Sequence, residues 1–476
     1  MGIDIRPADG KLYGLGLTGS LYTLDPSTGA ATLKTTLKAM AGDDNPYAAL
    51  AGTQFAVDFN LAADRLRIVS NSGQNLRINV DTGDTTTDGA IAAAGASITA
   101  AAYTNSFAGT TGTQLFGLDV AAGLLRLQDP PNNGTLAAGV TLGVTADAAN
   151  GFDIDARTNT GYAALTVGAE TALYTVNLGA TANAATKTGV IAGGAAIRGL
   201  ALAATPAPTA VALTGDNKLA AFDPRKPNTL TTTTAITGLG NGEAMLGIDF
   251  RPKDGLLYGV ATGGKLYTID PSTGAATLRA TLVADPADAT APYVGLTGTG
   301  AFSVDFNPAA DRLRVIGNDG QNLRIAVESS TTGSTTVTAG NTTTDGVLNR
   351  AAGAASVIAS AYTNSFAGAT TTALYNLEQN TDSLTLQSPP NDGVLVDVGA
   401  LGVDISTTAG FDIGGGANGM VLAALRTGGT GPFTLYTVSL TTGAATLYQN
   451  ASANAALSQI GGAGGPTNLV DVAIRF

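Results

Sequence analysis

The chain contains two copies of one sequence module. The octapeptide AYTNSFAG occurs at Ala102–Gly109 and again at Ala361–Gly368. Longer phrases recur in the same order: GIDIRPADGKLYG from Gly2 corresponds to GIDFRPKDGLLYG from Gly247, and LYTLDPSTGAATL corresponds to LYTIDPSTGAATL. A tandem duplication of a module of roughly 200–250 residues explains this recurrence, and one all-β domain can occupy a module of that size. The sequence therefore predicts two similar domains.

Each copy contains a shorter repeat of about 45–50 residues. Runs such as KLYGLG, SLYTLDP and RLRIVS alternate apolar with polar residues and end at Gly, Asp, Pro or Asn. Such runs indicate half-buried antiparallel strands joined by hairpins, about four in each repeat. Four-stranded repeats of this length, with no helical pattern between them, are typical of β-propellers. We predict an all-β fold of tandem propellers with about five four-stranded antiparallel blades each. The segments that open the repeats of the first copy begin at Gly2, Ala56, Ala101, Gly151 and Ala196.

The two propellers are expected to span residues 1–204 and 205–476. Between the copies, VALTGDNKLAAFDP has the strand–turn–strand form of a blade, and the last residues, LVDVAIRF, resemble an opening strand. We expect residues 211–240 to pair with 469–476 and so to close the second propeller. The first propeller then lacks about three N-terminal strands, which are missing or supplied from elsewhere. If it takes Val211–Ile236 instead, the second propeller is the open one.

Charge and composition exclude several classes of function. The formal net charge is −12 and the basic residues are scattered, so no surface for neutralising phosphates is expected and a nucleic-acid partner is excluded. No apolar run approaches the ~18 residues of a membrane span. Cys, His and Trp are absent, which removes thiol nucleophiles, imidazole bases and soft-metal sites. An acidic chain rich in Thr, Gly and Ala favours an extracellular or cell-surface location, and no signal peptide is visible in this chain.

The recurring phrases resemble those of a bacterial family described as a domain of unknown function. The phrases are GIDFRP…LYG, LYTIDPSTGAATL, DRLRV…GQNLRI and YTNSFAG, and the similarity covers essentially the whole chain, twice. The resemblance implies a secreted protein of the propeller type and implies no reaction. It also implies an opening strand pair like Leu213–Asp223, which the first copy lacks, so we expect the sequence to be truncated or processed.

One aspartate lies midway along each of seven predicted inner strands. Because the first strand of a propeller blade lines the central channel and side chains alternate along a strand, each copy should carry a partial ring of carboxylates. We favour neutralisation by Arg6, Arg198 and Arg251, which lie on or beside the same strands; the alternatives are a cation site and the acid/base pair of a glycoside hydrolase. The channel-lining aspartates are Asp4, Asp58, Asp153, Asp249, Asp305, Asp412 and Asp471.

A polar hairpin occurs in both copies, in DRLRIVSNSGQNLRI and DRLRVIGNDGQNLRI. Its alternation favours a cross-strand polar ladder that satisfies an acidic neighbour, and recognition of an acidic ligand is the alternative. The residues of this face are Arg65, Arg67, Gln74, Asn75 and Arg77 in the first copy and Arg312, Arg314, Gln321, Asn322 and Arg324 in the second.

An acidic loop is a second candidate cation site. Asp81, Asp84 and Asp88 in NVDTGDTTTDG offer oxygen ligands that suit Ca²⁺, although Asp-Thr-Gly stretches are also ordinary turns. No other cofactor is expected.

No residue pattern indicates catalysis, so we predict that the protein is not an enzyme. We expect an extracellular structural protein that self-assembles head to tail into a durable filament, matrix or surface layer. Its partner would be itself, because an incomplete blade leaves a sheet edge that templates further strands, and extracellular polysaccharide is a second candidate partner. The alternative functions are a secreted propeller glycoside hydrolase that uses the channel carboxylates, and a ligand-binding adhesin.

Overall fold

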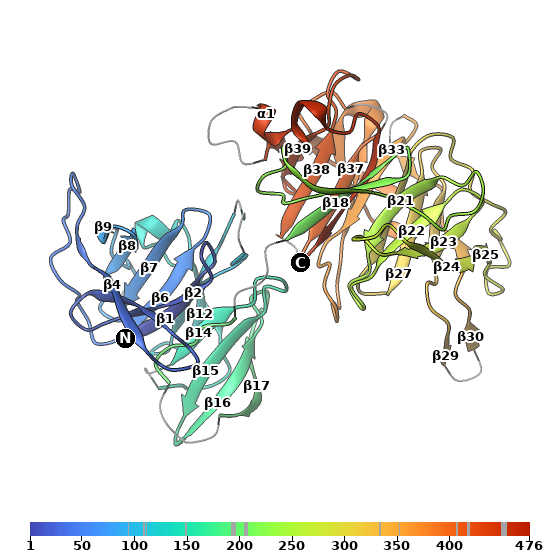
Figure 1. Ribbon diagram of the computed structural model, residues 1–476. Helices are drawn as coiled ribbons and strands as arrows, with labels where there is room; N and C mark the ends of the chain where they lie inside the picture. The colour runs from blue at the N-terminus through green and yellow to red at the C-terminus, as the bar shows by residue number, and fades with distance from the viewer. Residues whose placement is uncertain are drawn as a thin grey trace. The chain divides into compact units, whose positions relative to one another are not determined.

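The chain forms two compact, nearly all-β units. The computed structural model describes residues 1–93, 95–107, 110, 112–147, 150–191, 197–203, 208–332, 335–351, 353–405, 408–416, 419–448 and 455–476. Unit 1 comprises Met1–Pro206 and unit 2 comprises Ala207–Phe476 (Figure 1). Within the described residues α1 (Ala455–Ser458) is the single α-helix, and no helix there is long and apolar enough to cross a membrane.

The described residues of unit 1 form four antiparallel sheets in chain order. Each sheet runs from an inner to an outer strand, and a short parallel strand, β5 (Lys38–Ala39), extends the second sheet beyond β9. The sheets are β1 (Gly2–Arg6), β2 (Lys11–Leu15), β3 (Ser20–Leu24) and β4 (Ala31–Thr36); β6 (Phe55–Asn60), β7 (Arg65–Ser70), β8 (Asn75–Ile78) and β9 (Asp84–Thr87); β10 (Ile98–Tyr103), β11 (Leu115–Asp119), β12 (Leu124–Gln128) and β13 (Val140–Thr141); β14 (Gly151–Ile154), β15 (Gly161–Val167), β16 (Glu170–Val176) and β17 (Ala185–Val190).

Five such sheets lie in the part of unit 2 that the structure describes. Two carry a short parallel outer strand, β25 (Val283–Ala284) or β32 (Asn349–Arg350), and β29 (Ser330–Thr332) pairs with β30 (Thr335–Val337) in a separate hairpin. The sheets are β41 (Leu469–Arg475), β18 (Thr209–Thr214), β19 (Lys218–Phe222) and β20 (Leu230–Ala235); β21 (Met245–Phe250), β22 (Leu257–Ala261), β23 (Lys265–Ile269) and β24 (Ala276–Thr281); β26 (Phe302–Asn307), β27 (Arg312–Gly317), β28 (Asn322–Ile325) and β31 (Asn341–Thr344); β33 (Val357–Tyr362), β34 (Leu374–Glu378), β35 (Ser383–Gln387) and β36 (Val394–Ala400); β37 (Gly410–Gly414), β38 (Met420–Leu425), β39 (Thr434–Val438) and β40 (Ala445–Leu447).

Local turn chemistry sets the hairpins within the sheets. In DPSTG, the Asp25 carboxylate accepts the N–H groups of Ser27 (2.8 Å) and Thr28 (3.2 Å), and Gly29 has a φ of 72°. A positive φ is strained for any residue with a Cβ, so glycine is needed at the end of this turn. The hairpin between β3 and β4 is therefore determined by a five-residue phrase.

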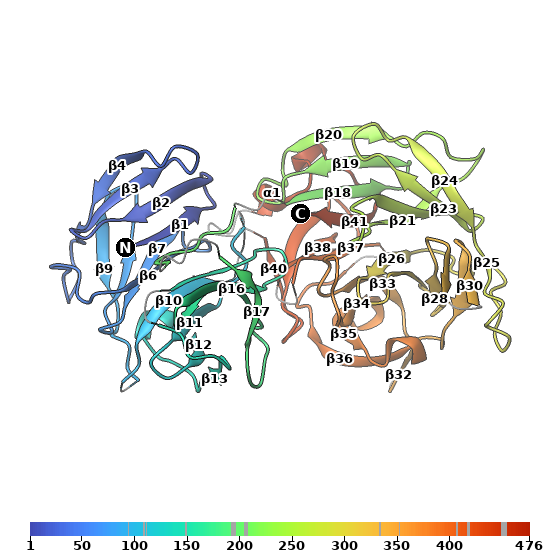
Figure 2. The same cartoon turned by 90° about the horizontal axis from the view of Figure 1, so that it is seen from below.

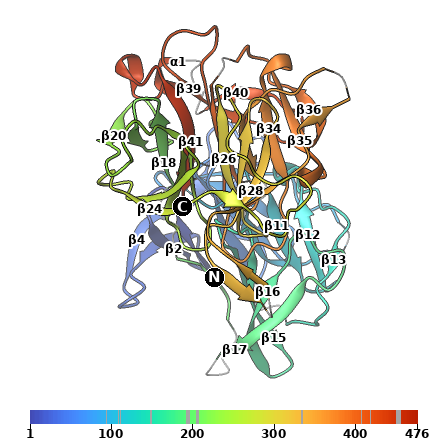
Figure 3. The ribbon, with the colours of Figure 1, turned by 90° about the vertical axis from the view of Figure 1, so that its right-hand side faces the viewer.

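The first and last segments of unit 2 share one sheet. β18 pairs antiparallel with β41, with Leu213 opposite Asp471. Figures 2 and 3 show the green β18 and β20 beside the red β41. The inner strands contact one another in turn: β21 contacts β26, β26 contacts β33, β33 contacts β37, β37 contacts β41, and β41 contacts β21. Five sheets around one ring of inner strands form a five-bladed β-propeller, which confirms the predicted fold class.

Unit 1 has the same arrangement with an incomplete fifth blade. A Cβ at Gly199 would lie 3.0 Å from Cγ1 of Ile3, and a Cβ at Gly151 would lie 2.6 Å from the carbonyl carbon of Gly199. Residues 197–203 therefore lie between β1 and β14, where a fifth inner strand belongs. In the described part of unit 1 no further strand is added to this segment. Ala196, which was predicted to open this blade, lies outside the described residues.

Apolar contacts between neighbouring blades make up the core. Tyr13 on β2 packs edge-on against Phe59 on β6, with ring centroids 5.3 Å apart, and Tyr258 and Phe306 repeat the contact at 5.3 Å in unit 2. The duplicated sequence therefore produces duplicated packing, with polar Thr-rich outer strands such as β20 facing solvent.

Candidate functional site

All seven predicted channel aspartates lie on inner strands and are buried. None of them is more than 6% exposed. They occupy β1, β6 and β14 in unit 1 and β21, β26, β37 and β41 in unit 2. A carboxyl group buried to this extent needs hydrogen-bonding partners.

Those partners are main-chain N–H groups, most of them on the next blade. One oxygen of Asp4 accepts the N–H of Ile5 (2.7 Å), and the other accepts the N–H of Phe59 on β6 (2.7 Å). The carboxylate thus joins two inner strands that belong to separate sheets. The same inter-blade bond joins Asp58 to Tyr103 (2.9 Å), Asp153 to Leu202 (2.6 Å), Asp249 to Phe306 (2.7 Å), Asp305 to Tyr362 (2.9 Å), Asp412 to Ile474 (2.5 Å) and Asp471 to Ile248 (3.0 Å).

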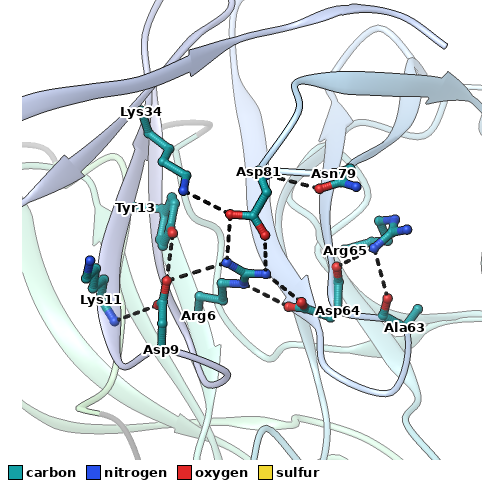
Figure 4. Close-up of polar contacts among 10 residues, drawn as sticks. All are labelled: Arg6, Asp9, Lys11, Tyr13, Lys34, Ala63, Asp64, Arg65, Asn79 and Asp81. Carbon is teal, nitrogen blue, oxygen red and sulfur yellow. Dashed lines mark hydrogen bonds and ion pairs between the residues drawn. The ribbon is translucent and has the colours of Figure 1, made fainter.

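The predicted neutralisation of these aspartates by arginine is wrong. Among the described residues no ion pair involves any of the seven. Arg6 lies two residues beyond Asp4, about 7 Å along the strand, and pairs with Asp64 (2.5 Å) and Asp81 (2.9 Å) on the neighbouring blade (Figure 4).

The other two arginines of that prediction also lie apart from the carboxylates. Arg251 pairs with Asp311 (2.6 Å) and Glu328 (2.8 Å), which repeats the contacts of Arg6. Arg198 lines a cavity of about 220 Å³ together with Gln54 and Asn150. Arg6 ends β1 and Arg251 follows β21, whereas main-chain N–H groups on the neighbouring blade satisfy the aspartates.

The aspartates gather into one triad in each unit. One oxygen each of Asp4, Asp58 and Asp153 lies within 4.8 Å of the others, and Asp249, Asp305 and Asp412 repeat this grouping. Burial raises the pKa of Asp153 to about 7 and that of Asp412 to about 6. Burial, and after it the charge of the neighbouring aspartates, also raises the pKa of the remaining triad members. Each triad therefore retains protons near neutral pH.

The polar hairpin forms a buried network in both copies. Arg67, only 2% exposed, donates to Asn75 (2.8 Å), to Asp88 (2.5 Å) and to the hydroxyl of Tyr103 on β10 (3.1 Å). Arg77 donates to the same Asp88 carboxylate at 2.6 and 2.8 Å. The network joins the second blade to the third. In unit 2 it is repeated by Arg314, Asn322, Arg324, Asp345 and Tyr362.

The remaining residues of the predicted polar face lie outside this network. Arg65 donates to the backbone oxygen of Asp64 (2.9 Å), and Arg312 donates to that of Asp311 (3.1 Å). The amide of Gln74 bonds to the backbone of Ala49 and Ala51, and Gln321 binds a corresponding loop through Gly295 and Thr297. These side chains anchor loops of their own blade.

The structure does not bring the three aspartates of the proposed calcium loop together. Asp81 pairs with Arg6 and Lys34, each at 2.9 Å. Asp84 begins β9 and accepts from Thr82 (2.7 Å), whereas Asp88 follows β9 and accepts from the buried arginine network. Four steps of extended chain separate Asp84 from Asp88 by about 13 Å, too far for one ion.

Sequence reasoning identified the aspartates and missed their role. Their spacing along the chain marks them as inner-strand residues, but their acceptor function depends on an N–H group some tens of residues away. The apolar neighbours of each aspartate were the available signal, because a carboxylate between buried apolar residues must be satisfied internally. On β10 and β33, alanines Ala102 and Ala361 occupy the position that an aspartate takes on the other inner strands. They precede the N–H donors Tyr103 and Tyr362.

A ring of inner strands joined by buried carboxylates makes this chain a tandem β-propeller protein. The family follows from the sequence: the chain belongs to the family described as Domain of unknown function (DUF4394), whose model matches residues 1–201 and 218–461. No curated protein matches the chain.

Several solved structures resemble the chain weakly. A protein from Lactobacillus plantarum is 15% identical, with 77% of this chain and 96% of that chain covered and a TM-score of 0.29. The Dos1 propeller is 13% identical, with coverage of 65% and 73% and a TM-score of 0.25. The Cps50 (Swd1) β-propeller domain of Myceliophteria thermophila is 12% identical, with coverage of 82% and 98% and a TM-score of 0.26. Similarities this low carry no argument about function.

Proposed function

We propose that this protein is an extracellular structural protein that assembles head to tail with further copies into a durable filament, matrix or surface layer, and that it has no enzymatic activity. One observation carries the proposal: the candidate catalytic carboxylates are buried and bridge neighbouring blades. A glycoside hydrolase requires two carboxyl groups, roughly 5–10 Å apart, that a sugar can reach. The seven inner-strand aspartates are instead buried and hydrogen-bonded to main-chain N–H groups of neighbouring blades.

The bonding pattern favours durability. Blades of a propeller are separate sheets, so their main chains form no ladder with each other. Here each aspartate supplies a hydrogen bond across such a boundary, and Arg67 and Arg314 add buried networks that join β7 to β10 and β27 to β33. Buried networks in which every member is satisfied rigidify a fold.

The difference between the units favours head-to-tail growth. Unit 2 has a complete fifth blade, whereas the fifth blade of unit 1 consists of its inner segment alone in the described residues. A contact between two unlike surfaces continues into a filament unless its rotation closes a ring. We also propose an extracellular polysaccharide as a ligand of the assembled layer.

Light scattering on the purified full chain, coupled to size-exclusion chromatography, tests this function. We expect species larger than the 47.1-kDa chain that grow with concentration, survive hot detergent and appear as filaments or sheets in negative stain. A monodisperse monomer across a wide concentration range would contradict the proposal.

An activity assay tests the enzyme alternative. The full chain and its Asp58→Asn/Asp153→Asn variant are incubated with a panel of polysaccharides, and released reducing ends are measured. We expect no release by either protein. Release by the unaltered chain alone would assign hydrolysis to the inner carboxylates.

A further inference from the structure

The two copies bury corresponding residues to different degrees. In unit 2, the sheet β41–β18–β19–β20 covers one face of the sheet β21–β24. Val211, Leu213 and Leu219 of the covering sheet pack in one cluster with that face. The covered residues are 6% exposed or less: Ile248, Phe250, Leu257, Tyr267 and Ile269.

Among the described residues of unit 1, no sheet covers the corresponding face. Its residues stand at the same places in the repeated phrases and in the same strand registers, yet each is only partly buried. The packing within the sheet agrees: a Cβ at Gly14 would lie 2.9 Å from Leu24 and 3.7 Å from Ile3, so these side chains share one side of the sheet. We call this surface the open face; it consists of Ile3, Ile5, Leu12, Tyr22 and Leu24.

The inner segment beside the open face is also unpaired as a strand. Residues 197–203 take the place that β41 takes in unit 2: the N–H of Leu202 donates to Asp153, as the N–H of Ile474 donates to Asp412. In unit 2 the ladder from β41 continues into β18. Among the described residues of unit 1, nothing continues it.

We propose that the open face and segment 197–203 bind a three-stranded antiparallel polypeptide segment of the same sequence type as Thr209–Ala235, which completes the fifth blade. Unit 2 supplies the template, because β18–β20 provide the apolar side chains and the ladder hydrogen bonds that unit 1 lacks. A glycan or a small ligand cannot supply both. The inference rests on the proposed function and deepens it, since a segment carried by a neighbouring molecule forms the junction between copies.

The test uses the full chain and a synthetic polypeptide of residues 208–240. Calorimetric titration should show one binding site per chain. Hydrogen exchange should slow at β1, β2, β3 and residues 197–203 when the polypeptide is present. A polypeptide carrying Leu213→Asp should bind at least tenfold more weakly, because Leu213 is wholly buried in its template.

Variants of the chain localise the binding. Leu24→Asp on the open face should weaken binding at least tenfold. The matched control is Leu33→Asp on the outer strand β4, where the side chain is 58% exposed, and it should leave binding unchanged. Circular dichroism confirms that both variants are folded, and Ile5→Asp replaces Leu24→Asp if the latter is not.

Three outcomes would overturn the inference: no binding by the folded chain, equal weakening by both variants, or exchange protection elsewhere. Binding to a chain that never polymerises would support this inference and contradict the filament. Polymers that form but that the polypeptide does not disrupt would support the filament and contradict this inference.

Discussion

Asp4 and Asp249 show how a single carboxylate links two sheets that share no main-chain ladder. Each accepts one N–H from its own strand and one from the next blade, all at 2.7 Å. A hydrogen bond to a carboxylate contributes roughly 1.5–3 kcal/mol to the free energy of unfolding, and loss of the acceptor leaves a buried N–H unsatisfied. The buried aspartates therefore act as hydrogen-bond acceptors rather than as members of ion pairs.

Replacement of Asp58 tests the acceptor role. Asp58→Ala should lower the free energy of unfolding by roughly 1–3 kcal/mol, because the N–H of Tyr103 loses its acceptor. Asp58→Asn keeps an acceptor oxygen and should cost less than half as much. Urea unfolding measures both, with Asp44→Ala at an exposed position as the control. Equal losses for alanine and asparagine would argue that charge, not the hydrogen bond, is important.

The raised pKa values predict stability that falls as pH rises. An unfolded aspartate has a pKa near 3.8, whereas Asp153 has a pKa of about 7 and Asp412 of about 6. Between pH 4 and 7 the folded chain therefore binds more protons than the unfolded chain. Stability is then lost with rising pH, by about 1.4 kcal/mol per pH unit for each additional proton.

The opposite limb of the pH profile belongs to the surface ion pairs. Arg6 and Lys34 lower the pKa of Asp81 to about 2, so its contribution is present above pH 4 and is lost as pH falls toward 2. Urea unfolding from pH 3 to 8 should show a maximum near pH 4 and a decline from there toward pH 7. Asp153→Asn should flatten the upper limb, and stability that rises from pH 5 to 8 would contradict this account.

At the scale of an element, the polar hairpin builds one buried hydrogen-bond network from residues of neighbouring strands. β7 and β8 bring Arg67 and Asn75 together, and the loop after β9 brings Asp88, so three consecutive elements build one network. Its contact with Tyr103 extends it to the next blade. Because the second copy repeats these contacts around Arg314, the hairpin has a fixed structural role in this fold.

Replacement of the buried arginine tests this network. Arg67→Lys should lower the free energy of unfolding by roughly 3–5 kcal/mol, because an ammonium cannot reproduce the planar fork and Asp88 is left underpaired. Arg314→Lys should behave alike in unit 2. The control is Arg65→Lys, which should change stability by less than about 0.5 kcal/mol. Comparable losses at Arg65 and Arg67 in urea unfolding would contradict the network.

At the scale of the whole molecule, the two copies of the module differ in their fifth blade, which is complete in unit 2 and incomplete in the described residues of unit 1. The sheet that joins β41 to β18 closes unit 2, and it buries apolar residues whose counterparts in unit 1 form the open face. Two units with separate cores are expected to unfold separately.

Calorimetry tests whether the two units unfold separately and differ in stability. The full chain should show two unfolding transitions, and Leu213→Ala in β18 should lower only the later one, by roughly 2–5 kcal/mol, because it leaves a cavity in the closed blade. Hydrogen exchange assigns each transition to a unit. A single transition, or a shift of both by this variant, would contradict independent units of unequal stability.

Much of this architecture was predictable from short stretches of sequence. Alternation predicted the strands, DPSTG predicted a hairpin, and the repeat length predicted four-stranded blades, because each depends on residues close in the chain. The aspartates of the inner strands were located in the same way. Their partners were not predicted, since Asp4 bonds to Phe59 and Asp471 bonds to Ile248 across blade boundaries.

The sequence by itself determined the duplication, the all-β class, the blade period and the positions of the buried carboxylates. Only the tertiary structure decided that main-chain N–H groups satisfy those carboxylates, that Arg6 pairs with another blade, that Asp81, Asp84 and Asp88 stay apart, and that one face of β1–β3 is open. The physical reason is ring closure. Packing blades around an axis places residues far apart in the chain beside one another, and their hydrogen bonds and burial depend on that placement rather than on local pattern.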